Sequence, residues 1–236
     1  MKFFAFLFSV FAFSLGGFVF AQEERDFDLA DFDRIDLSAG VVLIADIGPE
    51  QSVMVKTDRG DFSDFEIDVK NGKLNVSRRW NRLAWHEKKV KYKVIVSVPS
   101  LSGVEASSGS HAKISNLDAK LFSADLSSGA HVSLEGRCDD CNVDVRSGAR
   151  IHGKMFTCTN AKVDVASGGR VELAVLQNLL ADASSGGGAY IFGEPTQRTI
   201  DRSSGGRVKL VSKDHRGHHP HRPRPDHKHD RREPHP

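Results

Sequence analysis

A Ser-Gly step recurs at nearly constant spacing through the second half of this 236-residue chain. The glycines of the recurring segments are 20, 19, 20, 18 and 19 residues apart. A fixed period of this length is typical of a solenoid, in which each unit is too small to bury a core and stacks on its neighbours. The segments are ASSGSHAKI from Ala106, LSSGAHVSL from Leu126, VRSGARIHG from Val145, VASGGRVEL from Val165, ASSGGGAYI from Ala183 and RSSGGRVKL from Arg202.

The residues around each glycine alternate between apolar and polar. Apolar side chains stand five and three residues before it, as Val143 and Val145 do, and return three and usually five residues after it, as Val132 and Leu134 do. A period of two indicates strands, and a glycine between them suits a corner. We therefore predict an all-β, right-handed parallel β-helix with coils of about 20 residues and two or three short strands per coil. A β-sandwich is the alternative, but its turns do not require the same residues at every corner.

The repeats divide the chain into unequal parts. Residues 101–212 carry the regular Ser-Gly repeats, and residues 22–100 contain less regular strands with one imperfect corner, Asp36-Leu37-Ser38-Ala39-Gly40. A solenoid exposes an unpaired strand edge at each end, so an irregular N-terminal β cap is expected. We predict a single β-helix domain over residues 22–212.

The first 21 residues resemble a secretory signal. Lys2 precedes an apolar run from Phe3 to Phe20, and Val19 and Ala21 are compact enough for cleavage after Ala21. An uncleaved anchor is the alternative, because the run is long enough to span a membrane. We expect export to the periplasm, the outer surface or the medium. A formal net charge of +2 creates no global field for nucleic acid, so no nucleic-acid partner is expected.

Three cysteines, Cys138, Cys141 and Cys158, follow the signal segment. Export permits a disulfide, and Cys138 and Cys158 each precede a repeat glycine by ten residues, so they are expected on adjacent coils about 4.8 Å apart. Pairing of Cys138 with Cys141 is a second possibility, and three small core residues are a third. A metal site is the weakest interpretation, because no second ligand pair follows the C-x-x-C motif at zinc-finger spacing.

Charged residues flank the corners in two sets. An acid stands four residues before every repeat glycine, and a basic residue stands two residues after all but one of them. If the coils stack in register, each set forms a column with a spacing of about 4.8 Å. Either both columns are solvated faces, or one binds a linear polymer or divalent cations by multivalency. Calcium is disfavoured, because evenly spaced single carboxylates lack converging oxygens. The acids are Glu105, Asp125, Asp144, Asp164, Asp182 and Asp201, with Asp36 at the early corner, and the basic residues are His111, His131, Arg150, Arg170 and Arg207.

The segment RRWNRLAWHEKK, from Arg78 to Lys89, contains both tryptophans of the chain. Aromatic and basic side chains together can stack on sugars or bind anions. The candidate ligand-binding residues are Arg78, Arg79, Trp80, Arg82 and Trp85. Alternatively, the two tryptophans cover the open end of the core.

Residues 213–236 are rich in histidine and proline and nearly devoid of apolar residues, so a disordered tail is expected. Clustered imidazoles can bind zinc, copper or nickel, and protonated imidazoles can bind anionic glycans or lipid surfaces. A hydrophilic tail without a ligand is the alternative. The candidate metal ligands are His215, His218, His219, His221, His227 and His229.

The order of LSAGVVLIADIG, KNGKLNV, VSVPSLSGVEASSGS and successive Ser-Gly corners resembles the putative auto-transporter adhesin, head GIN domain family, over roughly residues 26–210. The resemblance implies a bacterial envelope or secreted β-helix protein that binds rather than catalyses. Catalysis needs an acid, a base and a stabilising cation at one place, whereas the charged residues here recur uniformly.

We therefore predict a non-catalytic, exported surface or envelope adhesin whose partners are glycans or surface proteins. An envelope metal-binding protein that acts through its tail is the second hypothesis. A polysaccharide-active enzyme is the third.

Overall fold

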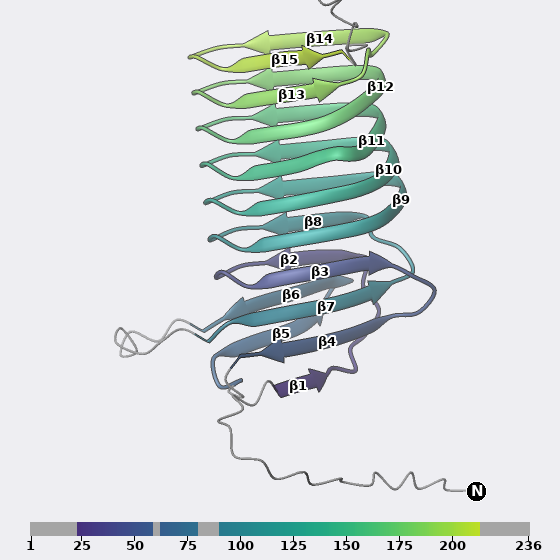
Figure 1. Cartoon of the computed structure of the whole chain (residues 1–236), viewed down its shortest axis with the longest axis vertical. Helices are drawn as coiled ribbons and strands as arrows, with labels where there is room; N and C mark the ends of the chain where they lie inside the picture. Colours follow the sequence, from purple (N-terminus) through teal and green to yellow (C-terminus); the bar gives the residue numbers. More distant parts are fainter. Residues whose placement is uncertain (1–22, 59–61, 80–89, 213–236) are drawn as a thin grey trace, which may run out of the picture.

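The computed structural model describes residues 23–58, 62–79 and 90–212. Within these ranges the chain forms an elongated stack of coils with fifteen strands and no helix, so none of the described residues forms a helix that could cross a membrane (Figure 1). The strands are β1 (Glu23–Asp26), β2 (Arg34–Leu37), β3 (Val42–Ile47), β4 (Ser52–Thr57), β5 (Phe65–Lys70), β6 (Lys73–Arg78), β7 (Tyr92–Val98), β8 (Gly103–Ala106), β9 (His111–Leu126), β10 (His131–Val145), β11 (Arg150–Val165), β12 (Arg170–Ala183), β13 (Gly188–Phe192), β14 (Gln197–Arg202) and β15 (Arg207–Val211).

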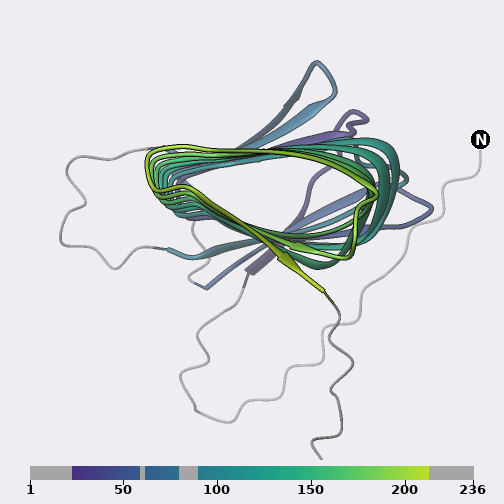
Figure 2. The same cartoon turned by 90° about the horizontal axis from the view of Figure 1, so that it is seen from above.

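The coils form a flattened ring when viewed along the stack (Figure 2). One face has the strand order β1-β4-β7-β3-β9-β10-β11-β12-β13-β15. The other face has the order β5-β6-β2-β8, continued by the second halves of β9 to β12 and by β14. Pairing between the repeat coils is parallel and in register, so the predicted β-helix with coils of about 20 residues is confirmed.

The regular coils differ from the prediction in one respect. Each of β9 to β12 is a single strand of 14–16 residues that bends from one face to the other, where two or three short strands were expected. Register shifts accompany the bend, for example between Leu134 and Gly136 in the pairing of β10 with β9. Strand pairing is thus interrupted at the bend and resumes beyond it.

The Ser-Gly corners are tight turns with two consecutive residues at positive φ. Ser128 has a φ of 50° and Gly129 a φ of 72°, and the Ala130 N–H donates to the Ser127 carbonyl at 3.0 Å. These are the features of a type I′ turn, which requires positive φ at both central positions. The Gly129 N–H also donates to the Ser147 carbonyl of the next coil at 3.1 Å. Equivalent N–H to carbonyl hydrogen bonds join the other successive corners. Each coil therefore turns with the same backbone geometry as its neighbours.

The core lies between the two faces and consists of the apolar residues of the alternating pattern. Val143, Val145 and Val163 are fully buried. Within the core Phe122 and Phe156 meet edge to face, with ring centroids 5.5 Å apart. The predicted inward side chains are therefore those that form the core.

The N-terminal end does not follow the chain order of a simple solenoid. β6 and β7 pair in parallel with β2 and β3, yet β8, which comes next in the chain, lies on the opposite side of β2 (Figure 1). Antiparallel strands close this end: β4 pairs with β7, β5 with β6, and β1 with β4. The irregular N-terminal part thus provides a β cap, as expected.

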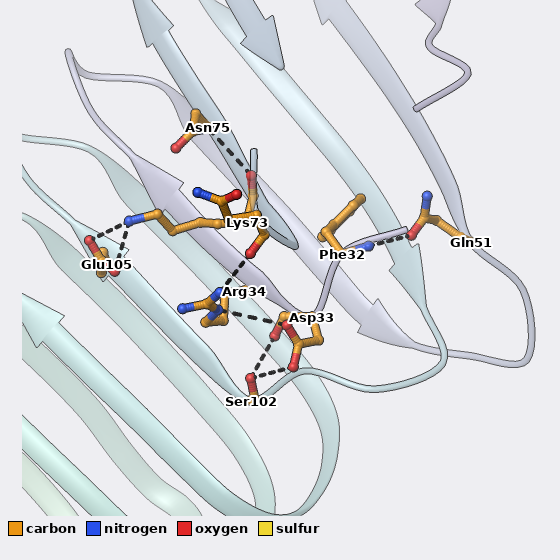
Figure 3. Close-up of polar contacts among 9 residues, drawn as sticks. Phe32, Asp33, Arg34, Gln51, Lys73, Asn75, Ser102 and Glu105 are labelled. Carbon is orange, nitrogen blue, oxygen red and sulfur yellow. Dashed lines mark hydrogen bonds and ion pairs between the residues drawn. The ribbon is translucent and has the colours of Figure 1, made fainter. Parts of the chain in front are cut away.

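Polar contacts join the cap to the first regular coil (Figure 3). The Lys73 ammonium on β6 reaches over β2 to both carboxylate oxygens of Glu105 on β8 at 3.1 Å, and lies 3.8 Å from Asp36 on β2. The Ser102 hydroxyl donates to the Asp33 carboxylate at 2.7 Å. These contacts link three strands that are far apart in sequence.

Candidate binding site

The acidic residues form one continuous column, as the repeat spacing predicted. Strand pairing places them in register, and cations from neighbouring positions lie among them. The Arg146 guanidinium lies 2.7 Å from Asp144 and 3.4 Å from Asp125. Burial, and then the neighbouring Glu105 carboxylate, raise the pKa of Asp36 against the opposing effect of Lys73. The column is thus a partly neutralised surface, and its members are Asp36, Glu105, Asp125, Asp144, Asp164, Asp182 and Asp201.

The basic column lies on the other face of the same corners. His111, His131, Arg150 and Arg170 are in register, and the column continues through Gly188 to Arg207. The imidazoles of His111 and His131 stack with their ring centroids 5.0 Å apart. Partial burial, and then the positive charges of His111, Arg150 and His152, lower the pKa of His131. His131 therefore becomes protonated at a lower pH than an ordinary imidazole does.

A groove runs along the stack on the face opposite the basic column. Its volume is about 860 Å³, and it extends from Ser102 across neighbouring coils to Thr199. Two rows of side chains line it, one on either side of a floor of buried residues. The first row is Leu121, Asp140, Asn160, Asn178 and Gln197, the second is Ser123, Asn142, Lys162, Leu180 and Thr199, and the floor contains Phe122, Cys141, Ala161 and Leu179.

Three side chains of the first row form a hydrogen-bonded ladder. The Asn160 amide donates to Asp140 Oδ1 at 2.7 Å, and the Asn178 amide donates to Asn160 Oδ1 at 2.6 Å. Each amide keeps a second N–H for a ligand, because an Asn side chain has two donor hydrogens. The ladder therefore presents oriented polar groups at strand spacing, about 4.8 Å apart.

Apolar side chains border the polar ladder. Leu121 is 66% exposed and Leu180 is 45% exposed, although both are large hydrophobic residues on a charged surface. Exposed apolar groups rimmed by polar ones mark interaction sites. Asp140 is the single carboxylate among the described lining residues of the groove.

The predicted aromatic and basic site is described only in part. Trp80, Arg82 and Trp85 lie outside the described residues, so their role stays a prediction. Arg78 pairs with Asp64 and lies 5.3 Å from the centroid of the Tyr92 ring. Both contacts hold Arg78 within the cap.

The neighbouring arginine and the histidine tail complete the list of predicted site residues. The Arg79 guanidinium bonds to Glu66 Oε1 at 3.0 Å. All the predicted metal ligands, His215, His218, His219, His221, His227 and His229, lie outside the described residues. Metal binding by the tail stays a prediction.

Sequence reasoning did not identify the groove. Its signal was present, because Asp140, Asn160, Asn178 and Gln197 are 20, 18 and 19 residues apart, the same period as the corners. The alternation of apolar and polar residues weakens at the bend, however. The inward and outward positions there could not be assigned before the register was known.

A comparison with known families identifies the family of this chain. The sequence of residues 31–195 matches the family described as putative auto-transporter adhesin, head GIN domain. The chain belongs to this head GIN domain family. A comparison with curated proteins gives no match.

Solved structures of bacterial proteins are similar to this chain to different degrees. A putative adhesin from Bacteroides fragilis is similar, with a TM-score of 0.58 and 13% identity over 81% of this chain and 97% of that one. A putative lipid binding protein from Parabacteroides distasonis has a TM-score of 0.46 and 15% identity over 80% of this chain and 96% of that one. At these identities the Bacteroides fragilis structure supports the fold alone. The family name fits an adhesin-like surface protein.

Proposed function

We propose that this head GIN domain protein is an exported, non-catalytic surface adhesin that binds an extended glycan along the groove. The ladder of Asp140, Asn160 and Asn178, continued in register by Gln197, carries the proposal. A linear polymer presents equivalent groups at regular intervals, and a row of equivalent protein groups along the stack can contact several of them together. Such multivalent contact converts individually weak hydrogen bonds into useful affinity.

The chemistry of the groove favours a sugar chain. Its amides and hydroxyls can pair with sugar hydroxyls, while Leu121 and Leu180 offer apolar surface to the C–H faces of sugar rings. The described lining residues include two cations, Lys162 and Arg198, and one carboxylate, Asp140. The Lys162 ammonium lies 3.5 Å from Asp164, which partly neutralises it. The net charge of the lining is therefore small, so the groove fits a neutral glycan better than a highly charged one.

Binding is favoured over hydrolysis by the number of carboxylates. Glycoside hydrolysis generally uses two carboxyl groups about 5 to 10 Å apart. Among the described lining residues Asp140 stands alone, and the Asn160 amide donates to it. The lining of the groove therefore favours polysaccharide binding. It argues against the third hypothesis, a polysaccharide-active enzyme.

The test is a binding screen of residues 22–236 against neutral polysaccharides, acidic polysaccharides and extracellular matrix proteins. Asn160→Ala and Asn178→Ala are expected to weaken binding to a neutral polysaccharide by about fivefold each, because a hydrogen bond contributes roughly 1 kcal/mol. Asn75→Ala is the matched control, since Asn75 also donates to a carboxylate, that of Asp68 at 2.7 Å, on a strand away from the groove. If Asn160→Ala, Asn178→Ala and Asn75→Ala all bind the polysaccharide with the same affinity, the groove is not the binding site.

A chain that ends at Ser212 separates the groove from the second hypothesis, metal binding by the tail. Glycan binding that survives the truncation supports the groove. Glycan binding lost with residues 213–236 assigns the activity to the histidine-rich segment instead.

A further inference from the structure

The three cysteines gather at one point of the core beneath the groove. Cys138 and Cys141 lie on β10 and Cys158 lies on β11, with exposures of 2%, 4% and 0%. Their sulfur atoms all lie within 4.8 Å of one another. All three sulfur atoms thus share one small volume.

Valence limits what this cluster can contain. A disulfide sulfur bonds to one other sulfur, so three cysteines form one disulfide and leave one thiol. The Cα atoms of Cys141 and Cys138 are 6.3 Å apart, and those of Cys141 and Cys158 are 6.1 Å apart. Both separations lie in the usual disulfide range of about 4.4 to 6.8 Å. Cys141 therefore has two partners of equivalent reach.

We propose that the cluster is a thiol–disulfide exchange site in which the bond of Cys141 moves between Cys138 and Cys158. The Cys158 thiolate attacks Cys141 Sγ, the Cys141–Cys158 bond forms and the Cys138–Cys141 bond breaks. Cys138 leaves as a thiolate and takes up the proton that Cys158 lost. No oxidant or reductant is consumed, because the number of disulfides is unchanged.

The surroundings of the cluster control the rate of exchange. The register partners of the cysteines on adjoining strands include Ala119, Phe122, Ala161 and Val175, all apolar. An apolar environment disfavours the thiolate, which is the attacking species. Exchange is therefore slow enough for each pairing to be trapped chemically.

Access to the cluster is from the groove. Cys141 lines the groove, whereas Cys138 and Cys158 do not. A low-molecular-weight thiol that enters the groove thus meets the central sulfur first. Its thiolate forms a mixed disulfide with Cys141 and releases the partner cysteine as a thiol.

The two pairings constrain the fold differently. The Cys138–Cys141 bond spans a separation of 3 residues within β10, whereas the Cys141–Cys158 bond spans 17 residues and joins adjacent coils. A longer closed loop restricts the unfolded chain more. Exchange to the Cys141–Cys158 pairing therefore cross-links β10 to β11 beneath the groove, and exchange back to Cys138–Cys141 removes that cross-link.

The first test is a thiol map of the full chain purified without reductant. The chain is unfolded in guanidinium with excess N-ethylmaleimide, digested, and analysed by mass spectrometry. One maleimide per chain is expected, divided between Cys138 and Cys158, with Cys141 always in the disulfide. Label on one residue alone, on all three or on none would overturn the proposal.

Two variants and a refolding experiment test the exchange itself. Cys138→Ser is expected to contain only the Cys141–Cys158 bond, and Cys158→Ser only the Cys138–Cys141 bond. Wild-type chain oxidised in denaturant starts with a different ratio of pairings, and after refolding this ratio should converge on that of the native preparation. A ratio that stays where the denatured oxidation left it contradicts exchange.

Discussion

Replacement of Gly136 by alanine tests how the long strands bend. Gly136 lies on β10 beside the register shift and has a φ of 128°. A Cβ built there would lie 2.2 Å from the carbonyl oxygen and 2.6 Å from the nitrogen of Leu117 on the preceding coil. Both contacts are with backbone atoms, so a side-chain rotation cannot relieve them.

The cost follows from two effects. The φ of Gly136 is in a region where other residues bear roughly 1–3 kcal/mol of strain. Separating the two strands to admit a methyl group costs roughly another 1–3 kcal/mol. Gly136→Ala is therefore expected to lower the free energy of unfolding by about 2–6 kcal/mol.

Gly129→Ala is the matched control in the same coil. Gly129 has a φ of 72°, and a Cβ placed on it would have no atom within 4 Å other than those of Gly129 itself and its two chain neighbours. This variant therefore bears only the left-handed backbone cost of roughly 1–2 kcal/mol. Urea unfolding followed by circular dichroism in the strand region measures both variants. Equal destabilisation would refute the argument, because it would show that the bend tolerates a side chain at Gly136.

Two further predictions concern pH. The folded pKa of Asp36 is raised by burial and by Glu105, so its stabilising contribution is complete below the unfolded value of about 3.8 and is lost as pH rises through the folded pKa. Asp36→Asn is therefore expected to raise the urea midpoint at pH 7 and to have a smaller effect at pH 3.5; a lower midpoint at pH 7 would show that the ion pair with Lys73 dominates. The folded pKa of His131 is lowered by burial and by neighbouring cations, so its contribution is present above the unfolded value of about 6.5 and is lost as pH falls through the folded pKa. Between pH 7 and pH 5 the urea midpoint of His131→Gln is expected to fall less than that of the wild type. If the two midpoints change in parallel with pH, the pKa of His131 is not lowered in the folded protein.

The regular coils were predictable because their pattern is local. The Ser-Gly corners and the alternation around them specify a strand, a turn and a strand within each period, and stacking in register follows from the constant spacing. The acidic and basic columns could be predicted for the same reason. The family resemblance, confirmed over residues 31–195, pointed to the same fold.

The cap could not be derived in this way. β6 and β7 pair with β2 and β3, while the chain then passes to the far side of β2 to form β8. Local alternation predicts that these segments are strands but does not specify their neighbours. That choice depends on which arrangement covers the end of the core.

The sequence by itself determined the repeating unit: its length, its corner, its inward side chains and the two charged columns. Tertiary structure decided the bend, where the strand turns from one face to the other and the simple alternation no longer assigns a side to each residue. Only the register of adjacent coils brings Asp140, Asn160 and Asn178 into one ladder and three cysteine sulfurs to one point beneath it. The physical reason is that both sites are built across coils, from residues whose proximity depends on how the coils stack.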